Sequence, residues 1–159
     1  MRTVICPGSF DPITNGHLDI IQRASSLFDH VIVLVAANQE KHSHFTLEER
    51  KSMIEEVISD LPNVEVDIFG GLLVDYIREK EAVAIVKGLR AVSDFEYEFQ
   101  MAMTNQKLCP SCDTLFFTPS PQNMYLSSSI VRQVAALGGD ITGFVPACLT
   151  EKIKNKLRK

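Results

Sequence analysis

The sequence predicts an α/β protein: a doubly wound, five-stranded parallel sheet of Rossmann-like type that ends in a C-terminal helix. Short apolar, β-branched runs alternate along all 159 residues with stretches whose apolar residues recur at helical spacing. This alternation is typical of a parallel sheet with helices on both faces, because right-handed crossovers lead each strand to the next. No linker, repeat or low-complexity stretch interrupts the pattern, so we expect a single domain spanning residues 1–159.

Five apolar runs predict the strands. The first is short and β-branched and leads into a loop rich in proline and glycine. The second is continuously apolar, which suits a strand that is buried on both faces. In chain order, we expect strands at residues 3–6, 31–37, 64–69, 82–87 and 115–118.

The segments between these runs predict helices. Thr46 and Glu49 have the Thr-x-x-Glu spacing of a capping box, and Pro62 stops the helix that follows. The pair Gly138-Gly139 closes a later helix, because glycine suits the left-handed position at a helix C-terminus. We expect helices at residues 16–28, 47–61, 72–81, 94–105, 127–137 and 146–158.

Composition and charge exclude several classes of protein. The net charge of −4 disfavours a protein that coats nucleic acid. No apolar run reaches the roughly 18 residues that a membrane span needs, and a Pro-Gly turn follows Met1 too soon for a secretory signal. We therefore expect a cytoplasmic protein with no nucleic-acid or membrane partner, in which a local cluster of donors binds any anionic substrate.

The cysteines provide a possible redox or metal motif. Cys109 and Cys112 have the spacing of a redox dithiol or of half a zinc site. Zinc would need two further ligands, and no second cysteine or histidine pair has matching spacing. A redox pair usually lies between a strand and a helix start, whereas this pair precedes a strand. We expect two thiols in a connecting loop and no metal site formed by the protein.

The predicted loops at one edge of the sheet carry groups suited to phosphate. Ligands of doubly wound folds bind beyond the carboxyl ends of the strands. After the first strand, Gly8 allows close approach, Ser9 offers a hydroxyl, and Gly16-His17 opens a helix whose N-terminus attracts anions. His17 can donate to a phosphate oxygen there.

Two more loops at this edge have the same character. Lys87-Gly88-Leu89-Arg90 places two cations around a glycine after the fourth strand. After the fifth strand, residues 126–132 place three serine hydroxyls at a helix start, with Arg132 one turn on. Three such loops at one edge predict a polyphosphate site.

These residues carry a resemblance to a known family. Residues 14–17, Thr-Asn-Gly-His, resemble the T/H-x-G-H signature of the nucleotidyltransferase superfamily, and residues 127–132 resemble its second motif. Residues 7–12, 45–50 and 88–98 are similar to segments of the bacterial phosphopantetheine adenylyltransferases. The similarity runs from the first strand to the last helix.

The resemblance implies a reaction and its components. Members of the family transfer AMP from ATP to 4'-phosphopantetheine with Mg²⁺, which gives dephospho-coenzyme A and pyrophosphate. The family is typically a homohexamer and is inhibited by coenzyme A. We expect the same substrates, the same metal, the same assembly and the same inhibitor for this chain.

The resemblance also implies residue roles. His17 would stabilise the transition state. Positions that match the family's ATP-binding residues are Ser9, Phe10, His17, Gly88, Leu89, Arg90, Glu98, Asn123, Met124, Tyr125, Leu126, Ser127, Ser128 and Ser129, to which the phosphate-suited Arg132 is added. Positions that match the acceptor-binding residues are Ser9, Lys41, Leu73 and Lys87.

Two departures from the family pattern concern the site. Lys87 replaces the usual arginine, which keeps the charge and loses the bidentate geometry. Asn123-Met124-Tyr125 differs from the usual Tyr/Trp-Ser-Phe, so the resemblance does not determine how this loop contacts adenine.

Other functions compete with this interpretation. The same fold serves acceptors such as nicotinamide mononucleotide or a cytidylyl acceptor, and residues 88–98 argue against these by family likeness alone. A nucleotide-binding regulator without turnover would be expected to lack the histidine or the cations, all of which are present. A thiol-redox protein based on Cys109 and Cys112 is a third alternative.

Overall fold

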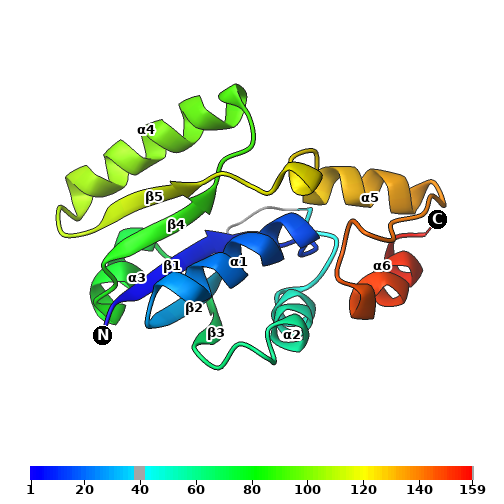
Figure 1. Ribbon diagram of the computed structural model, residues 1–159, viewed down its shortest axis with the longest axis horizontal. Helices are drawn as coiled ribbons and strands as arrows, with labels where there is room; N and C mark the ends of the chain where they lie inside the picture. The colour runs from blue at the N-terminus through cyan, green and yellow to red at the C-terminus, as the bar shows by residue number, and fades with distance from the viewer. Residues whose placement is uncertain (38–41, 159) are drawn as a thin grey trace.

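The predicted sheet is present in the computed structural model, which describes residues 1–37 and 42–158, with the side chains of Val92 and Ser93 excepted. Five parallel strands lie in the order β3-β2-β1-β4-β5, so the chain winds outward in both directions from β1 (Figure 1). This confirms the predicted fold class. The strands are β1 (Thr3–Gly8), β2 (His30–Ala36), β3 (Val64–Phe69), β4 (Ala84–Gly88) and β5 (Asp113–Phe117).

Helices cover both faces of the sheet. Along β1, Val4 and Cys6 pack with residues of α1 on one face, whereas Ile5 packs with residues of α3 on the other. In Figure 1, α5 and α6 lie together beyond the carboxyl ends of the strands. The helices are α1 (Asn15–Leu27), α2 (Leu47–Val57), α3 (Leu73–Lys80), α4 (Val92–Leu108), α5 (Ser128–Ala136) and α6 (Thr150–Leu157).

Some boundaries differ from those expected. β1 extends to Gly8 because its pairing with β2 continues, with Gly8 opposite Val35. The segment expected as one helix at 146–158 begins with a separate 3₁₀ turn, Ala147–Leu149, in which the amide of Leu149 donates to the carbonyl of Pro146. α2 ends at Val57, earlier than expected. The Leu61 amide then donates to the Ile58 carbonyl and forms a turn directly before Pro62. α4 is longer than expected at both ends.

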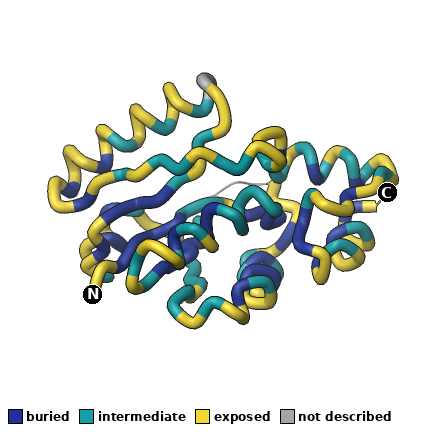
Figure 2. The backbone as a smooth tube through the Cα atoms, viewed as in Figure 1, coloured by how far each residue is buried: buried dark blue, intermediate teal, exposed yellow. Residues whose placement is uncertain are grey.

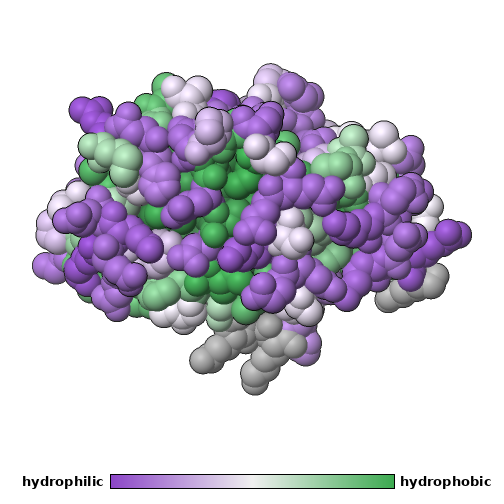
Figure 3. Space-filling view, turned by 90° about the horizontal axis from the view of Figure 1, so that it is seen from below, coloured by the Kyte–Doolittle hydropathy of each residue, from purple (hydrophilic) through white to green (hydrophobic). Residues whose placement is uncertain are grey.

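The core strands and the outer helix differ in burial. β1, β2 and β4 are buried along most of their length, whereas α4 is largely exposed (Figure 2). The exposed large apolar side chains of α4 are Phe95, Tyr97, Phe99, Met101, Met103 and Leu108. Apolar side chains also form a central band between hydrophilic margins on the face shown in Figure 3. The described surface therefore has apolar areas that nothing in the single chain covers.

The cysteine pair lies where a connecting loop was expected. Cys109 caps the end of α4 and Cys112 directly precedes β5. Both thiols are free and buried, and burial raises the pKa of Cys112 to about 11. The thiol of Cys112 is therefore a poor nucleophile at neutral pH.

Within residues 1–37 and 42–158, no helix combines the length and the apolar character needed to cross a bilayer.

Candidate active site

Two adjoining pockets open at the carboxyl ends of the strands. The first, the His17 pocket, has a volume of about 530 Å³ and lies among the loops that follow β1, β4 and β5. The second, the α4 pocket, also has a volume of about 530 Å³ and lies between α4 and the ends of β1, β2 and β3. The three loops predicted from the sequence do meet. The two pockets share Pro7, Gly8, Ser9, Lys87 and Glu98.

The protonation of His17 follows from its contacts at the start of α1. The backbone N–H of Thr14 donates to Nδ1 of His17 over 3.0 Å, and the Thr14 hydroxyl lies 3.2 Å from the same atom. A backbone N–H can only donate, so Nδ1 must be an unprotonated acceptor and the proton of the neutral ring lies on Nε2. The same contacts form a capping box, because the His17 amide donates to the Thr14 side chain. His17 is therefore held as a neutral Nε2–H donor.

The surroundings of His17 keep it uncharged. Burial and, to a lesser extent, the nearby charge of Arg90 lower the pKa of His17 to about 4. The ring of Phe10 packs edge-on against it, with centroids 5.1 Å apart. Phe10 is itself buried and has a left-handed backbone with φ of +50°. A Cβ atom on Gly8 would lie 3.0 Å from the Phe10 ring, so any larger residue at position 8 would press on this ring and require it to shift.

Two predicted cations of the His17 pocket also tie its loops together. Arg90 donates through Nη1 to the Leu126 carbonyl over 2.7 Å and through Nε to Asp94 over 3.2 Å. Arg132 on α5 donates through Nη1 to the Asp11 carbonyl over 2.6 Å. A guanidinium has five N–H donors, so each arginine can hold a loop and still offer donors to an anion.

The serine hydroxyls have separate roles. The Ser127 hydroxyl accepts from the Ile130 amide and caps α5, and the Ser128 hydroxyl donates to the Pro12 carbonyl over 2.7 Å. Within the described part of the chain, the Ser129 side chain forms no hydrogen bond, and it lines the pocket. Ser129 is therefore the hydroxyl of this turn best placed to contact a ligand.

Residues of α1 and its N-terminus connect distant parts of the site. The Asp19 carboxylate accepts from the amide and the hydroxyl of Ser120 over 3.1 and 2.9 Å, which anchors the loop after β5. Arg23, one turn further on, donates to the Thr118 carbonyl. At the start of the helix, the Asn15 side chain donates to the Gly143 carbonyl over 2.8 Å. α1 thus holds the loop after β5 close to His17.

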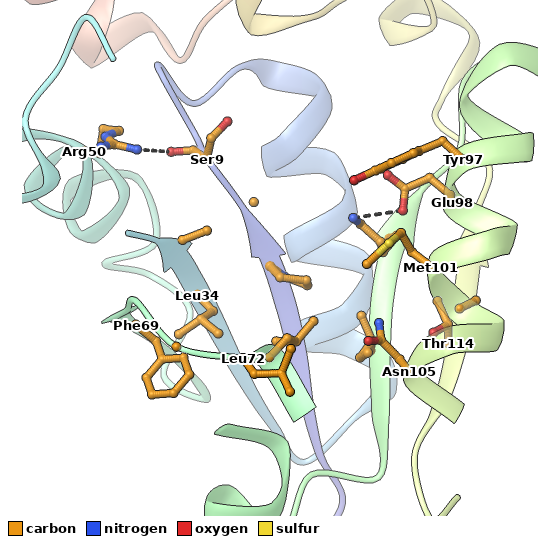
Figure 4. Close-up of a pocket in the computed structure, with 18 of the residues that line it drawn as sticks. Ser9, Leu34, Arg50, Phe69, Leu72, Tyr97, Glu98, Met101, Asn105 and Thr114 are labelled. Atoms are coloured by element: carbon orange, nitrogen blue, oxygen red, sulfur yellow. Dashed lines mark hydrogen bonds and ion pairs between the residues drawn. The ribbon is translucent and has the colours of Figure 1, made fainter. Parts of the chain in front are cut away.

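The α4 pocket is largely neutral. Its described charged residues are Arg50, Lys87 and Glu98, and most of the others are apolar or small. Lys87 Nζ lies 2.9 Å from Glu98 Oε2, at the wall that both pockets share. In Figure 4, Arg50 reaches Ser9 from one side, while Tyr97, Glu98 and Met101 of α4 face the pocket from the other.

The predicted site residues divide between the two pockets and the regions around them. Ser9, Phe10, His17, Gly88, Arg90, Glu98, Asn123, Leu126, Ser127, Ser128, Ser129 and Arg132 line the His17 pocket. Ser9, Leu73 and Lys87 line the α4 pocket. Leu89, Met124 and Tyr125 are not among the lining residues; Tyr125 is 58% exposed and packs on Phe144. Lys41 lies outside the described residues.

The structure adds residues that the sequence analysis did not single out. Tyr97, Met101 and Asn105 line the α4 pocket at spacings of four residues, which is one face of a helix and was visible as a pattern. Asp11 is buried, and its carboxylate accepts from the amides of His44 and Phe45, each over 2.9 Å. The sequence pattern does not show which amides Asp11 would bond.

Known proteins resemble this chain over most of its length. Residues 5–134 match the cytidylyltransferase-like family. Proteins named phosphopantetheine adenylyltransferase are 57% identical in Alkaliphilus oremlandii, over 98% of this chain and 99% of that protein, and 54% identical in Methylobacillus flagellatus, over 97% and 96%.

The fold also resembles that of a solved structure. A protein from Vibrio parahaemolyticus, assigned as a nicotinate-nucleotide adenylyltransferase, superposes with a TM-score of 0.75 over 98% of this chain and 93% of that one. The two are 19% identical, so this likeness concerns the fold alone. The identities to the curated relatives are far higher, and the chain belongs to the phosphopantetheine adenylyltransferase family of nucleotidyltransferases.

Proposed function

We propose that this chain is the enzyme that transfers AMP from ATP to 4'-phosphopantetheine, giving dephospho-coenzyme A and pyrophosphate in coenzyme A biosynthesis. The observation that carries the proposal is the shared wall of the two pockets, at Ser9 and Lys87. A transferase that joins two phosphates must bring them together at one place. The two pockets have equal volumes and share the Ser9 hydroxyl and the Lys87 ammonium group, so they fulfil this requirement.

ATP occupies the His17 pocket in this proposal. His17, Arg90, Arg132 and Ser129 surround its phosphates, and donors of this kind suit a polyphosphate. The remaining ATP residues proposed by resemblance are Ser9, Phe10, Gly88, Leu89, Glu98, Asn123, Met124, Tyr125, Leu126, Ser127 and Ser128. Because Phe10 is buried, its contribution to ATP would come through its backbone and through the position of the His17 ring.

Phosphopantetheine occupies the α4 pocket, with its phosphate at Ser9 and Lys87. The apolar side of the pocket, formed by residues such as Leu73 and Met101, suits the pantetheine arm, and Asn105 offers an amide to its polar groups. Lys41 is assigned to the same end by resemblance.

The chemistry needs no general base. The second pKa of a phosphate monoester is about 6, so the acceptor phosphate is largely ionised near neutral pH. One of its oxygens attacks the α-phosphorus of ATP, a new P–O bond forms, and the bond to pyrophosphate breaks. His17 donates Nε2–H to the α-phosphate, where charge is redistributed in the transition state, while the arginines hold the other phosphates. No covalent AMP–enzyme intermediate is formed.

We propose that Mg²⁺ arrives with the ATP phosphates. The carboxylates that line the His17 pocket already have partners: Asp11 binds two amides, Asp94 binds Arg90, and Glu98 pairs with Lys87. No group of three or more potential metal ligands occurs within the described part of the chain. The metal would neutralise phosphate charge rather than bind a protein cage.

We further propose a cytoplasmic homohexamer that coenzyme A inhibits. The exposed apolar residues of α4 support self-association, because apolar patches of this kind commonly mark interfaces. Coenzyme A contains both an adenylyl part and a pantetheine arm, so it could fill both pockets at once. Light scattering and inhibition kinetics would measure the two properties.

The proposed function is tested by offering ATP and Mg²⁺ with a panel of acceptors and measuring pyrophosphate release. We expect rapid release with 4'-phosphopantetheine and little with nicotinamide mononucleotide or pantetheine. A preference for nicotinamide mononucleotide would show that the protein has a different adenylyltransferase activity, one that uses the same fold. Nucleotide binding without turnover of any acceptor would instead identify a regulator.

A further inference from the structure

The α4 pocket contains a cation to which the proposed roles above assign no function. Arg50 on α2 is only 6% exposed, yet it lines this pocket beside Ser9 and Ser43. Figure 4 shows its side chain directed toward Ser9. A buried guanidinium is costly unless its charge is compensated, so its partners need to be identified.

The described partners of Arg50 are uncharged. Nη1 donates to the Ser9 carbonyl over 2.9 Å, and Nε lies 3.4 Å from the Thr46 carbonyl. Across residues 1–37 and 42–158, no carboxylate lies within ion-pair distance of the guanidinium. Nη2 has no acceptor among the described residues, and Arg50 lines the pocket, so this group can donate to a ligand there.

The other cation of the pocket differs in this respect. Lys87 Nζ lies 2.9 Å from Glu98 Oε2, so the pair has no net charge. Among the described residues that line the pocket, Arg50 therefore supplies the positive charge that is not already matched by a carboxylate. It also lies beside Ser9, where the two pockets meet.

We propose that Arg50 binds the phosphate of the acceptor and determines the preference for phosphorylated over unphosphorylated pantetheine. This rests on the proposed function. While Nη1 fixes the Ser9 carbonyl, Nη2 donates to a phosphate oxygen, and the buried charge is compensated when the acceptor binds. Lys87 remains with Glu98 and contributes less to this preference than Arg50 does.

The test measures binding of 4'-phosphopantetheine and of pantetheine to the full-length protein by calorimetry. Arg50→Gln should weaken phosphopantetheine binding about 10- to 100-fold, the range for a lost charge-assisted hydrogen bond. Binding of pantetheine should change little, since both ligands have the same arm. Arg50→Lys keeps the charge but loses the fork of donors, so its affinity for phosphopantetheine should lie between those of the wild-type protein and Arg50→Gln.

A matched control is the neighbouring lysine. Lys51→Gln removes one positive charge from the same helix, but Lys51 pairs with Glu55 and lines neither pocket. It should leave both affinities unchanged. An Arg50→Gln variant that keeps the wild-type ratio of the two affinities would overturn the proposal.

Two outcomes separate this inference from the proposed function. If the wild-type protein neither binds phosphopantetheine nor releases pyrophosphate with it, the proposed function is wrong. If Arg50→Gln does not fold, a structure of the wild-type protein with phosphopantetheine decides. Arg50 Nη2 should then lie about 3 Å from a phosphate oxygen. A phosphate with no contact to the guanidinium would exclude the role.

Discussion

The two pockets differ in how their walls are held. Around the His17 pocket, side chains from one loop bond the backbone of another: Arg90 to Leu126, Arg132 to Asp11, and Ser128 to Pro12. The α4 pocket is bounded mainly by apolar side chains, and its described polar ties are the Arg50–Ser9 and Lys87–Glu98 contacts. A reacting phosphate needs fixed donors, whereas a flexible arm needs mainly apolar surface.

Replacement of His17 should have the largest effect. His17→Ala should lower kcat about 10²- to 10³-fold with little change in the KM for ATP, as expected for a lost transition-state donor. His17→Gln should retain more activity, because its neutral amide can still donate. Steady-state kinetics would measure both. A nearly fully active His17→Ala, or a trapped AMP–enzyme species, would contradict the mechanism.

Lys87 at the shared wall should have the next largest effect. Lys87→Ala removes the ion pair and leaves Glu98 Oε2 buried without its counter-charge, so kcat/KM for the acceptor should fall about 10- to 100-fold. Lys87→Arg should keep or improve activity, because the charge is retained. Loss of activity in Lys87→Arg would mean that the shared wall is shaped for lysine.

A bulky side chain in the α4 pocket should affect one substrate only. Ala102 lines this pocket and not the His17 pocket, so Ala102→Phe should raise the KM for phosphopantetheine about tenfold and leave that for ATP unchanged. Gln100→Phe, an exposed position on the same helix that lines neither pocket, serves as a control. Equal changes for both substrates would show that the two pockets are not independent.

The smallest expected effect is on pH dependence. The pKa of His17 is lowered to about 4 in the folded protein, against about 6.5 when unfolded. The unfolded chain therefore binds more protons between these values, and this residue's contribution to the free energy of unfolding is complete above pH 6.5 and falls as the pH drops toward 4. His17→Gln should flatten that part of the stability curve. An acid limb of kcat near pH 6.5 that disappears in His17→Gln would contradict this, because it would show that the ring titrates near its ordinary pKa and not near 4.

The sequence predicted the parts of the site whose chemistry is local. His17, Arg90 and the serine turn follow strands or open helices, and the topology of a parallel sheet brings such positions to one edge. The loop around Met124 and Tyr125 was assigned to ATP by resemblance, but neither residue lines the His17 pocket or the α4 pocket. Their sequence differs from the family pattern at just this loop.

The remaining features depend on long-range packing. Arg50 belongs to a recognisable motif, yet the motif does not show that its buried side chain bonds the carbonyl of Ser9, 41 residues away. Similarly, the partners of the Asp11 carboxylate lie 33 and 34 residues on. The sequence shows that Tyr97, Met101 and Asn105 share one face of a helix, but it does not show which pocket this face lines. Such contacts are set by how the elements pack, which spacing alone does not encode.

Hydrogen bonds that join α1 and the loop before it to distant parts of the chain determine when the site is completed during synthesis of the protein. His17 is synthesised early, but the residues around it form hydrogen bonds with partners that are synthesised much later. Asp19 bonds Ser120, the Asp11 carbonyl bonds Arg132, and Asn15 bonds Gly143, with separations of 101, 121 and 128 residues. Chains are made from the N-terminus, and contacts between distant residues form last. A nascent chain that stops before α5 therefore contains His17 but lacks the later hydrogen-bond partners that hold the loops around it. Such a chain lacks the fixed donors of the His17 pocket. Catalytic competence thus arises only when nearly the whole chain has been made.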